Sequence, residues 1–327
     1  MELWADTAQQ YVDFLSYVEP DSACFADWTR GVIDDSEVLG WLAELPAVKR
    51  QPNLVFAAAR WHGVPAPGPY SRFREALLDD DGSIRNTILT RSTQTNEVGR
   101  LATLAPAFAR VSAETREPLA LIEVGASAGL CLYPDRYDYE WVGHGRLTGS
   151  GGPTLSCAVD GPMPVPHRYP DVAWRGGIDL NPLDVHDQDA MSWLATLVWP
   201  EQDHRVDRLE KAIEIARREP PVLSRGNLLD ELPSVVARAS AYGRVVVFHS
   251  AVIAYLDSVE RSAFQDLLHG LLANEACRWI SNEGKLVLPA VTATSPPIPE
   301  DLATFVLGVD GQAVAWTHGH GRSMTWL

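Results

Sequence analysis

The sequence predicts an α/β fold with a helical N-terminal region, over residues 1–115, and a doubly wound, mainly parallel sheet over residues 116–327. Apolar residues recur at helical spacing before residue 118. After it, short apolar runs alternate with longer helical stretches, the pattern of a parallel sheet whose strands are joined by helices. Near the C-terminus, two short apolar runs flank Asp310-Gly311, which predicts an antiparallel hairpin.

The helices of the N-terminal region are predicted from apolar spacing and from the prolines that follow them. We expect helices over residues 8–18, 36–45, 54–61 and 96–111. Pro20 and Pro46 end the first two helices, and Pro106 is expected to kink the last one.

The second region is expected to contain five buried strands with helices between them. The strands are predicted over residues 119–124, 172–179, 221–224, 244–249 and 277–281, and the helices over 189–198, 206–218, 229–239 and 259–272. A parallel sheet closed by a C-terminal antiparallel hairpin is the outline of the class I methyltransferase fold, which we expect here. Residues 131–171 interrupt the first strand–helix–strand unit, and we predict that they form an inserted, small antiparallel flap.

Composition excludes some classes of partner. The chain has 327 residues, which is natural for two domains, and a formal net charge of −16 that repels phosphate backbones and anionic lipid. We therefore expect a small-molecule substrate and no nucleic-acid or membrane partner.

No secretory signal or long apolar run is visible, and the four cysteines form no CxxC pair, so we expect a cytoplasmic protein with free thiols. The oligomeric state is not indicated.

A glycine-rich turn follows the first predicted strand. Gly125, Ser127 and Gly129 are spaced as in the methyltransferase pattern acid-x-G-x-G-x-G, with Glu123 as the acid and Ser127 as the only departure. The dinucleotide pattern G-x-G-x-x-G would need glycine at 127 and glycine or alanine at 130, and neither is present. We expect a helix after the turn and the Glu123 carboxylate near the ammonium of a methionine moiety. A tight turn without a ligand is the alternative interpretation.

An acid ends the second predicted strand. In both ligand classes such an acid binds the ribose hydroxyls, and Asp179 is placed to do so. Asp179 lies 54 residues beyond Gly125 (179 − 125), where about 20 is usual, and the predicted insertion would account for the difference. Without an insertion, the candidates would be Asp135, Asp138 and Glu140.

Polar residues also follow the later strands, at the edge where ligands bind in open α/β sheets. Asn227 is placed either to contact the adenine amine or to cap the next helix, and His249-Ser250 closes the fourth strand. The predicted cofactor contacts are Glu123, Gly125, Ala126, Ser127, Gly129, Asp179, Leu180, Asn181, Asn227, Leu228, His249 and Ser250.

Five residues are candidates for contact with a substrate. Asn96, Glu97 and Arg100 share one helix face and are expected to cover the site, although a solvated helix start is the alternative. His249 is either a general base or a core histidine satisfied by its neighbours. Tyr255 either lines the acceptor pocket or packs within a helix.

A metal site is not predicted. His318 and His320 form a Thr-His-Gly-His-Gly motif, but two histidines without a third ligand in view are better interpreted as loop residues.

Four segments resemble a bacterial family known as domain of unknown function 2332. They are residues 94–100, 174–185, 197–202 and 246–256. The resemblance covers nearly the whole chain and implies a helical N-terminal part and a Rossmann-like core similar to methyltransferases, without implying an activity. Family members often carry an acid where this chain has Asn227.

These observations lead to two hypotheses. The first is an S-adenosylmethionine-dependent methyltransferase that acts on a small molecule. The second is a non-catalytic nucleoside-binding protein that keeps the fold, which the departures at Ser127 and Asn227 would favour. A nicotinamide-dependent oxidoreductase would need glycine spacing that the sequence lacks.

Overall fold

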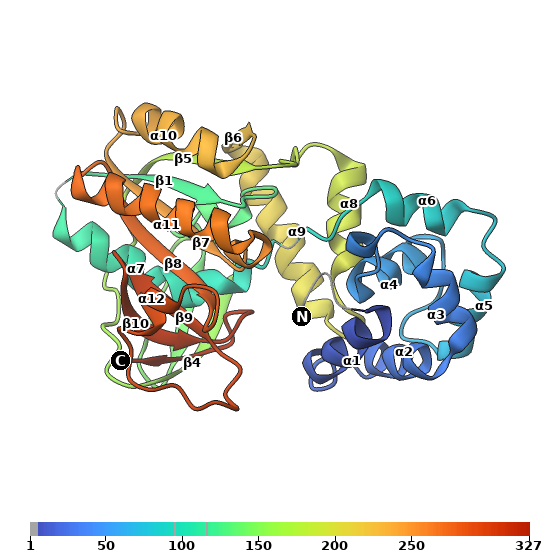
Figure 1. Ribbon diagram of the computed structural model, residues 1–327. Coiled ribbons are helices and arrows are strands. Elements are labelled where there is room, and N and C mark those ends of the chain that lie inside the picture. The colour runs from blue at the N-terminus through green and yellow to red at the C-terminus, as the bar shows by residue number, and fades with distance from the viewer. Residues whose placement is uncertain (1–5, 95, 116) are drawn as a thin grey trace. The chain divides into compact units, whose positions relative to one another are not determined.

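The computed structural model describes residues 6–94, 96–115 and 117–327, and its contacts divide the chain into two compact units. The helical unit comprises Met1–Thr95 and Asp187–Glu210, and the sheet unit comprises Asn96–His186 and Lys211–Leu327. The fold is mixed α/β with a large, mostly parallel sheet (Figure 1).

This division differs from the predicted boundary at residue 115. Residues 96–115 belong to the sheet unit because their helix packs on the sheet, where the rings of Phe108 and Phe248 lie 5.1 Å apart. Residues 187–210 belong to the helical unit because Trp193 and Trp199 are buried in its core. Both assignments depend on tertiary packing, which apolar spacing along the chain does not reveal.

The helical unit contains the predicted helices over residues 8–18, 36–45, 54–61 and 189–198, with small shifts at their ends. Three further helices were not predicted. None of the helices in the described part of the chain is long and apolar enough to span a bilayer. The helices are α1 (Thr7–Val18), α2 (Ala23–Asp34), α3 (Ser36–Ala43), α4 (Pro52–Trp61), α5 (Tyr70–Leu78), α6 (Ser83–Thr90) and α8 (Gln188–Leu197). α9 (Asp203–Arg218) contributes residues to both units.

Aromatic rings form the centre of the helical unit. Phe56 of α4 is fully buried, and its ring lies 4.9 Å from that of Phe25, 5.1 Å from that of Phe73 and 5.4 Å from that of Trp28. The contacts with Phe73 and Trp28 are edge-to-face and the contact with Phe25 is tilted, and such ring contacts add to the large apolar area that each ring buries. Helices far apart in the sequence are therefore held together through one side chain.

The five predicted parallel strands are present in the sheet unit. They are β1 (Leu119–Val124), β5 (Val172–Asp179), β6 (Val222–Arg225), β7 (Arg244–Ser250) and β8 (Arg278–Gly284). Their spatial order is β6-β5-β1-β7-β8, which reads 3-2-1-4-5 when they are numbered along the chain. This is the order of doubly wound sheets, and the direction of winding changes between β1 and β7. Ligands bind such sheets outside the carboxyl ends of the strands at this switch point.

The two faces of β1 pack differently. Ala120, Ile122 and Val124 point into a core that also contains residues of α10 (Leu228–Ala239) and α11 (Ser258–Ala273). Side chains alternate along a strand, so Leu121 and Glu123 point to the other face. α7 (Leu101–Glu114) packs on that face through the contact of its Phe108 with Phe248.

The rest of the sheet continues beyond β8, and the predicted C-terminal hairpin is part of it. β9 (Phe305–Val309) and β10 (Gln312–Thr317) are antiparallel, and the turn residues Asp310 and Gly311 both have positive φ. The eleven strands are in the order β3-β2-β4-β11-β10-β9-β8-β7-β1-β5-β6. The outer strands are β2 (Asp138–Val142), β3 (Gly145–Leu147), β4 (Thr154–Asp160) and β11 (Ser323–Trp326).

The segment predicted as an antiparallel flap extends the main sheet instead. Within this segment β2 and β3 form an antiparallel pair, while β4 pairs in parallel with both β2 and β11. Alternate side chains of β2 and β4 are buried, and the Trp141 indole donates a hydrogen bond to the Ala102 carbonyl of α7, at 2.8 Å. The segment therefore packs its apolar face against α7. A separate flap would leave that face exposed to solvent.

Replacing Phe56 with alanine should destabilise the helical unit. Loss of a fully buried ring and the cavity that remains should lower its free energy of unfolding by about 3–5 kcal/mol. Urea denaturation followed by tryptophan fluorescence would measure the change. The control is Val12→Ala, because Val12 is 45% exposed on α1 and its truncation should change the free energy by about 0.5 kcal/mol or less. Equal effects of the two substitutions would contradict the proposed role of Phe56.

Candidate functional site

The glycine turn lies at the switch point between β1 and β7. Gly125, Ser127 and Gly129 all have positive φ, at 71°, 51° and 70°. A Cβ at Gly125 would lie 2.3 Å from Val252 Cγ2, and one at Gly129 would lie 2.8 Å from Pro221 Cγ. Backbone conformation and packing therefore explain both glycines, so the glycines alone do not indicate a ligand.

The helix predicted after this turn is not present. Residues Leu130–Leu132 form a single 3-10 turn, η3, and the chain then continues irregularly to β2. Pro134 explains the difference, because a proline disfavours helical backbone at the preceding residue, Tyr133. The expectation of a helix directly after the glycine turn is therefore wrong.

Asp179 fastens the turn to the end of β5. Its Oδ2 accepts a hydrogen bond from the Ser127 amide at 2.8 Å, and its Oδ1 accepts one from the Asn181 amide at 2.7 Å. The carboxylate is half-buried, and each oxygen keeps a lone pair for a further donor. Ala126 is buried beneath the turn, whereas the Leu180 side chain is 73% exposed.

The other three acids considered for the ribose role have separate partners. Asp135 pairs with Arg175, and Glu140 pairs with Arg146. Asp138 accepts hydrogen bonds from Ser150 and Tyr169. All three acids lie in the segment that forms β2, β3 and β4 or just before it. Asp179, in contrast, is the acid at the end of β5, the strand beside β1.

Asn227 caps α10, as the alternative interpretation stated. Its side-chain oxygen accepts a hydrogen bond from the Leu229 amide at 2.9 Å, and Leu228 packs against the core beside it. The carbonyl oxygen of Asn227 is thus committed to the helix.

His249 is a core histidine, the second of the two roles that the sequence left open, and it is not placed to act as a general base. It is fully buried, with Nδ1 2.7 Å from Glu283 Oε1 and Nε2 3.0 Å from the Trp279 indole nitrogen. An indole N–H only donates, so Nε2 must accept and the proton must reside on Nδ1. Both ring nitrogens are therefore engaged, and neither can take a proton from a substrate.

Residues that precede β1 meet the carboxyl ends of β1 and β7. Arg100, in the 3-10 turn η2 (Val98–Arg100), donates from Nε to the Gly319 carbonyl at 2.8 Å and from Nη1 to the Ser250 carbonyl at 3.0 Å. Asn96 Oδ1 accepts from the Leu130 amide at 3.3 Å, and Glu97 Oε1 accepts from the Gly99 amide at 2.9 Å. Asn96, Glu97 and Arg100 thus lie at this edge of the sheet, but they do not share a helix face as predicted, because only Arg100 is in the 3-10 turn and Asn96 and Glu97 precede it in irregular backbone.

Tyr255 lies on the segment that follows β7. It ends the 3-10 turn η4 (Ile253–Tyr255), and it is 60% exposed, so it is not packed within a helix. Val252, on the same segment, covers Gly125. The carboxylate of Glu283 holds this segment by accepting hydrogen bonds from the amides of Val252 and Ile253.

Four buried polar atoms at this edge have no hydrogen-bond partner among the described residues. They are Glu123 Oε2, Ser127 Oγ, Asn96 Nδ2 and Glu283 Oε2. Leaving such an atom unsatisfied costs about 1–3 kcal/mol, so sites of this kind gain when a ligand supplies the missing partners. The glycine pattern predicted Glu123 and Ser127 as site residues.

Burial controls the protonation of Glu123. The side chain is 8% exposed, and desolvation raises its pKa well above the usual range. The Arg100 charge opposes this effect, whereas the Asp179 charge adds to it. The Cys131 thiol lies beside Glu123, and burial raises its pKa well above normal, so it is not a thiolate nucleophile.

Sequence reasoning missed the contribution of the loop between β10 and β11. His318 and His320 flank Gly319, whose carbonyl binds Arg100, and a Cβ at Gly321 would lie 2.0 Å from the Gly99 carbonyl oxygen. The two glycines of the Thr-His-Gly-His-Gly motif were the available signal for this close approach. In the described chain, no three His, Cys, Asp or Glu side chains are grouped as a metal site would require.

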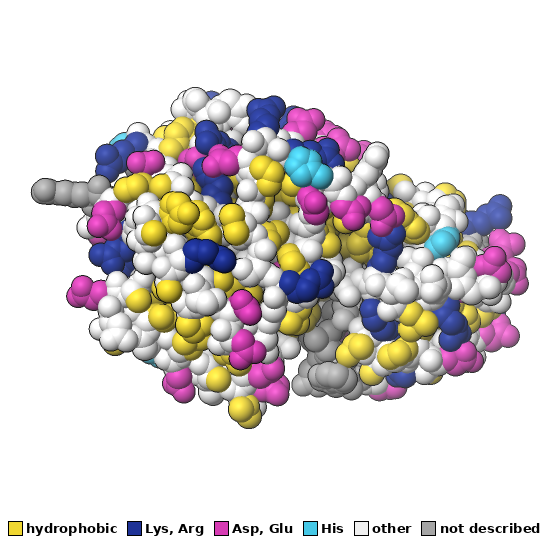
Figure 2. Space-filling model, turned by 90° about the horizontal axis from the view of Figure 1, so that it is seen from above, with side chains coloured by type: hydrophobic (Ala, Val, Ile, Leu, Met, Phe, Trp, Pro, Cys, Tyr) yellow, Lys and Arg dark blue, Asp and Glu magenta, His cyan; other side chains and the backbone are white. Residues whose placement is uncertain are grey.

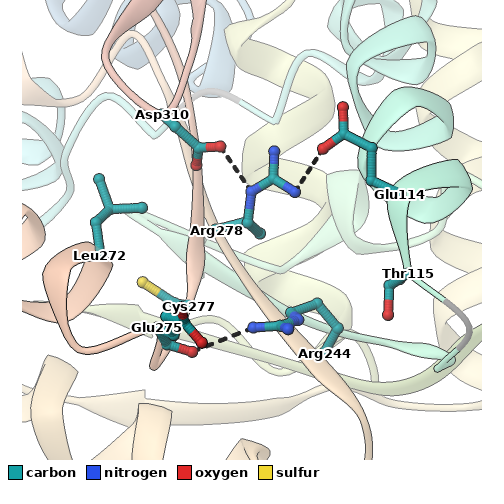
Figure 3. Close-up of a pocket in the computed structure, with 8 residues that line it drawn as sticks. All are labelled: Glu114, Thr115, Arg244, Leu272, Glu275, Cys277, Arg278 and Asp310. Atoms are coloured by element: carbon teal, nitrogen blue, oxygen red, sulfur yellow. Dashed lines mark hydrogen bonds and ion pairs between the residues drawn. The ribbon is translucent and has the colours of Figure 1, made fainter.

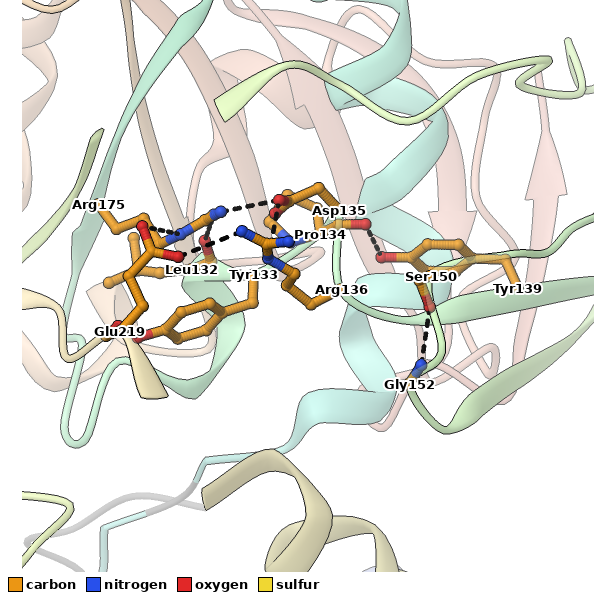
Figure 4. Close-up of polar contacts among 10 residues, drawn as sticks. All are labelled: Leu132, Tyr133, Pro134, Asp135, Arg136, Tyr139, Ser150, Gly152, Arg175 and Glu219. Carbon is orange, nitrogen blue, oxygen red and sulfur yellow. Dashed lines mark hydrogen bonds and ion pairs between the residues drawn. The ribbon is translucent and has the colours of Figure 1, made fainter. Parts of the chain in front are cut away.

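A buried arginine holds the loop that follows the glycine turn (Figure 4). Arg175 of β5 donates to the Leu132 carbonyl at 2.7 Å and to Asp135 Oδ2 at 2.8 Å, and its guanidinium lies 4.9 Å from the centre of the Tyr133 ring. The Tyr133 hydroxyl donates to the Glu219 carbonyl at 2.6 Å. These contacts fix the chain where the predicted helix is missing.

A pocket of about 470 Å³ lies at the other edge of the sheet, where β7 and β8 begin (Figure 3). Arg278 pairs there with Glu114 and Asp310, and Arg244 donates to the Glu275 carbonyl. None of the predicted site residues lines it. This pocket is therefore separate from the candidate site.

The chain is an α/β protein whose candidate site lies at the switch point of its sheet. The chain belongs to a family of bacterial proteins, DUF2332, described as "Uncharacterized protein conserved in bacteria", whose family model matches residues 60–326. No match was found among curated proteins or among solved structures.

Replacing Arg175 with methionine should destabilise the sheet unit far more than the same change at Arg136. Both arginines pair with Asp135 and Glu219, but the side chain of Arg175 is 3% exposed and that of Arg136 is 51% exposed. Breaking the buried pair should cost about 3–5 kcal/mol of unfolding free energy, and breaking the exposed one about 1 kcal/mol or less. Urea denaturation of both variants would measure the difference, and equal losses would argue against the assigned role of Arg175.

Proposed function

We propose that this chain is an S-adenosylmethionine-dependent methyltransferase that acts on a small molecule, with the cofactor at the carboxyl edge between β1 and β7. The observation that carries the proposal is the pair of buried, unpartnered atoms, Glu123 Oε2 and Ser127 Oγ, at the switch point of a 3-2-1-4-5 sheet. The class I methyltransferase fold that we proposed from the sequence is compatible with this order of parallel strands.

The residues present fit two of the three parts of such a cofactor. The Glu123 carboxylate would accept from the ammonium of the methionine moiety, and Ser127 Oγ would contact the same end. Asp179 has lone pairs left for the ribose hydroxyls after binding two backbone amides. The carbonyl of Asn227 is committed to its helix cap, so the adenine end has no assigned contact.

The bound cofactor would supply an activated methyl group. The chain's own part would be to bind and orient the acceptor, and positioning of this kind can contribute about 7–11 kcal/mol to lowering a barrier. His249 cannot serve if the acceptor must lose a proton, because both of its nitrogens are engaged. Of the predicted groups, Glu97 is then the remaining candidate base, and Tyr255 is exposed where an acceptor could contact it.

Surface charge supports a small-molecule substrate in preference to a nucleic acid. The chain carries a net charge of −16. On the face shown in Figure 2, the Lys and Arg side chains are scattered among acidic and apolar ones and form no continuous basic patch.

A second candidate function is binding of a nucleoside-bearing ligand without turnover. Two observations favour it, namely the engagement of both His249 nitrogens and the use of Asn227 as a helix cap. This alternative keeps the ligand at the same edge of the sheet.

Isothermal titration of the purified protein with S-adenosylmethionine, S-adenosylhomocysteine, NAD and ATP tests the proposed ligand. We expect micromolar binding of the first two and none of the others. Asp179→Ala should weaken binding at least about 100-fold, since each charge-assisted hydrogen bond contributes roughly 1.5–3 kcal/mol. Asp184→Ala is the control, because Asp184 is an exposed acid in the same loop.

If neither S-adenosyl compound binds the wild-type protein, the methyltransferase proposal is wrong. Binding without methyl transfer to any acceptor in a broad screen would favour the second candidate function.

A further inference from the structure

Arg100 and the carboxyl group of Glu123 lie at the same edge of the sheet without pairing. Arg100 Nη1 donates to the Ser250 carbonyl at the end of β7, and Glu123 is paired with Phe248, two residues earlier on the same strand, so both residues lie at the carboxyl edge of the sheet. The two side chains nevertheless form neither an ion pair nor a hydrogen bond, and Glu123 Oε2 accepts nothing from the described residues. A guanidinium and a carboxyl group that lie at one edge without pairing are both available to a third group, and a cationic group placed there would favour the ionised form of Glu123.

Arg100 is fixed in place and still has unused donors. A guanidinium has five N–H groups, and two of them bind the carbonyls of Gly319 and Ser250. Within the described chain, no carboxylate is paired with Arg100, whose side chain is half-buried and thus open to a ligand. The two carbonyl contacts come from the β10–β11 loop and from the end of β7, so the guanidinium is held from both sides.

Glu123 is equally constrained. It sits near the end of β1, in register with Gly177 of β5 and Phe248 of β7, and the residue is only 8% exposed. Such a group gains most from a partner that brings a positive charge and N–H donors.

We propose that Arg100 and Glu123 together bind the α-amino acid group of a ligand, with the guanidinium on the carboxylate and the Glu123 carboxylate on the ammonium. The proposal deepens the proposed function and rests on it for the location of the ligand at this edge. The group can belong to the methionyl end of an S-adenosyl cofactor or to a free amino acid, and both sources present the same chemistry.

Other ligand charges fit this pair less well. A simple anion would satisfy Arg100 but supply no donor to Glu123 Oε2, and a simple cation would pair with Glu123 but be repelled by Arg100. A neutral nucleoside would leave both groups unpaired in a partly desolvated site, at the cost of a buried charge without a partner. Only a zwitterion of short span satisfies the two together.

Titration of the wild-type protein with matched pairs of ligands tests the inference. S-adenosylhomocysteine and 5′-methylthioadenosine share a nucleoside, but only the first carries an amino acid. L-methionine and L-methioninol share a side chain and an ammonium, but only the first carries a carboxylate. We expect S-adenosylhomocysteine to bind at least about 100-fold more tightly than 5′-methylthioadenosine, and L-methionine more tightly than L-methioninol.

Variants assign the effect to the two residues. Arg100→Gln and Glu123→Gln should each reduce the affinity for S-adenosylhomocysteine toward that for 5′-methylthioadenosine, while the affinity for 5′-methylthioadenosine stays unchanged. Arg110→Gln is the matched control, because Arg110 is a half-exposed arginine on α7 that pairs with Glu114. Thermal unfolding of each variant shows whether it remains folded, and Arg100→Lys, which keeps the charge, should restore part of the affinity.

The outcomes separate this inference from the proposed function. Equal binding of S-adenosylhomocysteine and 5′-methylthioadenosine would overturn the inference and leave the cofactor proposal standing. Binding of L-methionine without binding of either nucleoside would support the inference and overturn the cofactor proposal. If no ligand with an α-amino acid group binds, both are wrong.

Discussion

One carboxylate, that of Asp179, determines the geometry of the candidate site. It joins the end of β5 to the turn after β1 by accepting the Ser127 amide, and it closes its own loop by accepting the Asn181 amide. Three residues of that turn have left-handed backbone, which costs free energy at the non-glycine position, Ser127. The hydrogen bond from the Ser127 amide to Asp179 offsets this cost. It also keeps the Ser127 hydroxyl at the switch point, where the direction in which the chain winds along the sheet changes.

Much of the sheet was predictable, because a buried parallel strand is a continuous apolar run bounded by breaks. β1, β5, β6, β7 and β8 were all expected at nearly their observed positions, as was the β9–β10 hairpin around Asp310-Gly311. The helices α2, α5 and α6 were missed, and α2 contains Gly31, which weakens a helical pattern. The pairing of β4 with β11 was not predictable, since the partners are more than 160 residues apart and neither carries a signal for the other.

The candidate site was predictable in part. Glu123, Ser127 and Arg100 were chosen on local patterns, and the structure brings them to the same edge of the sheet. The role of His249 was left open between base and core because its partners, Trp279 and Glu283, lie 30 and 34 residues further along the chain. Local spacing cannot show whether a histidine at a strand end will find both a donor and an acceptor across the neighbouring strand. The same limit applied to Arg175, whose acidic partners come from two separate loops.

The discontinuity of the helical unit affects how the chain can fold during synthesis. Trp193 and Trp199 belong to the core around Phe56, but they are encoded after β1 and β5. The N-terminal helices therefore leave the ribosome well before the side chains that complete their core, and the first parallel pair of the sheet emerges in between. A fragment ending at residue 95 would lack both tryptophans and expose the apolar surface that they cover. The helical unit can therefore complete its core only after part of the sheet unit has been synthesised, even though each unit has its own core.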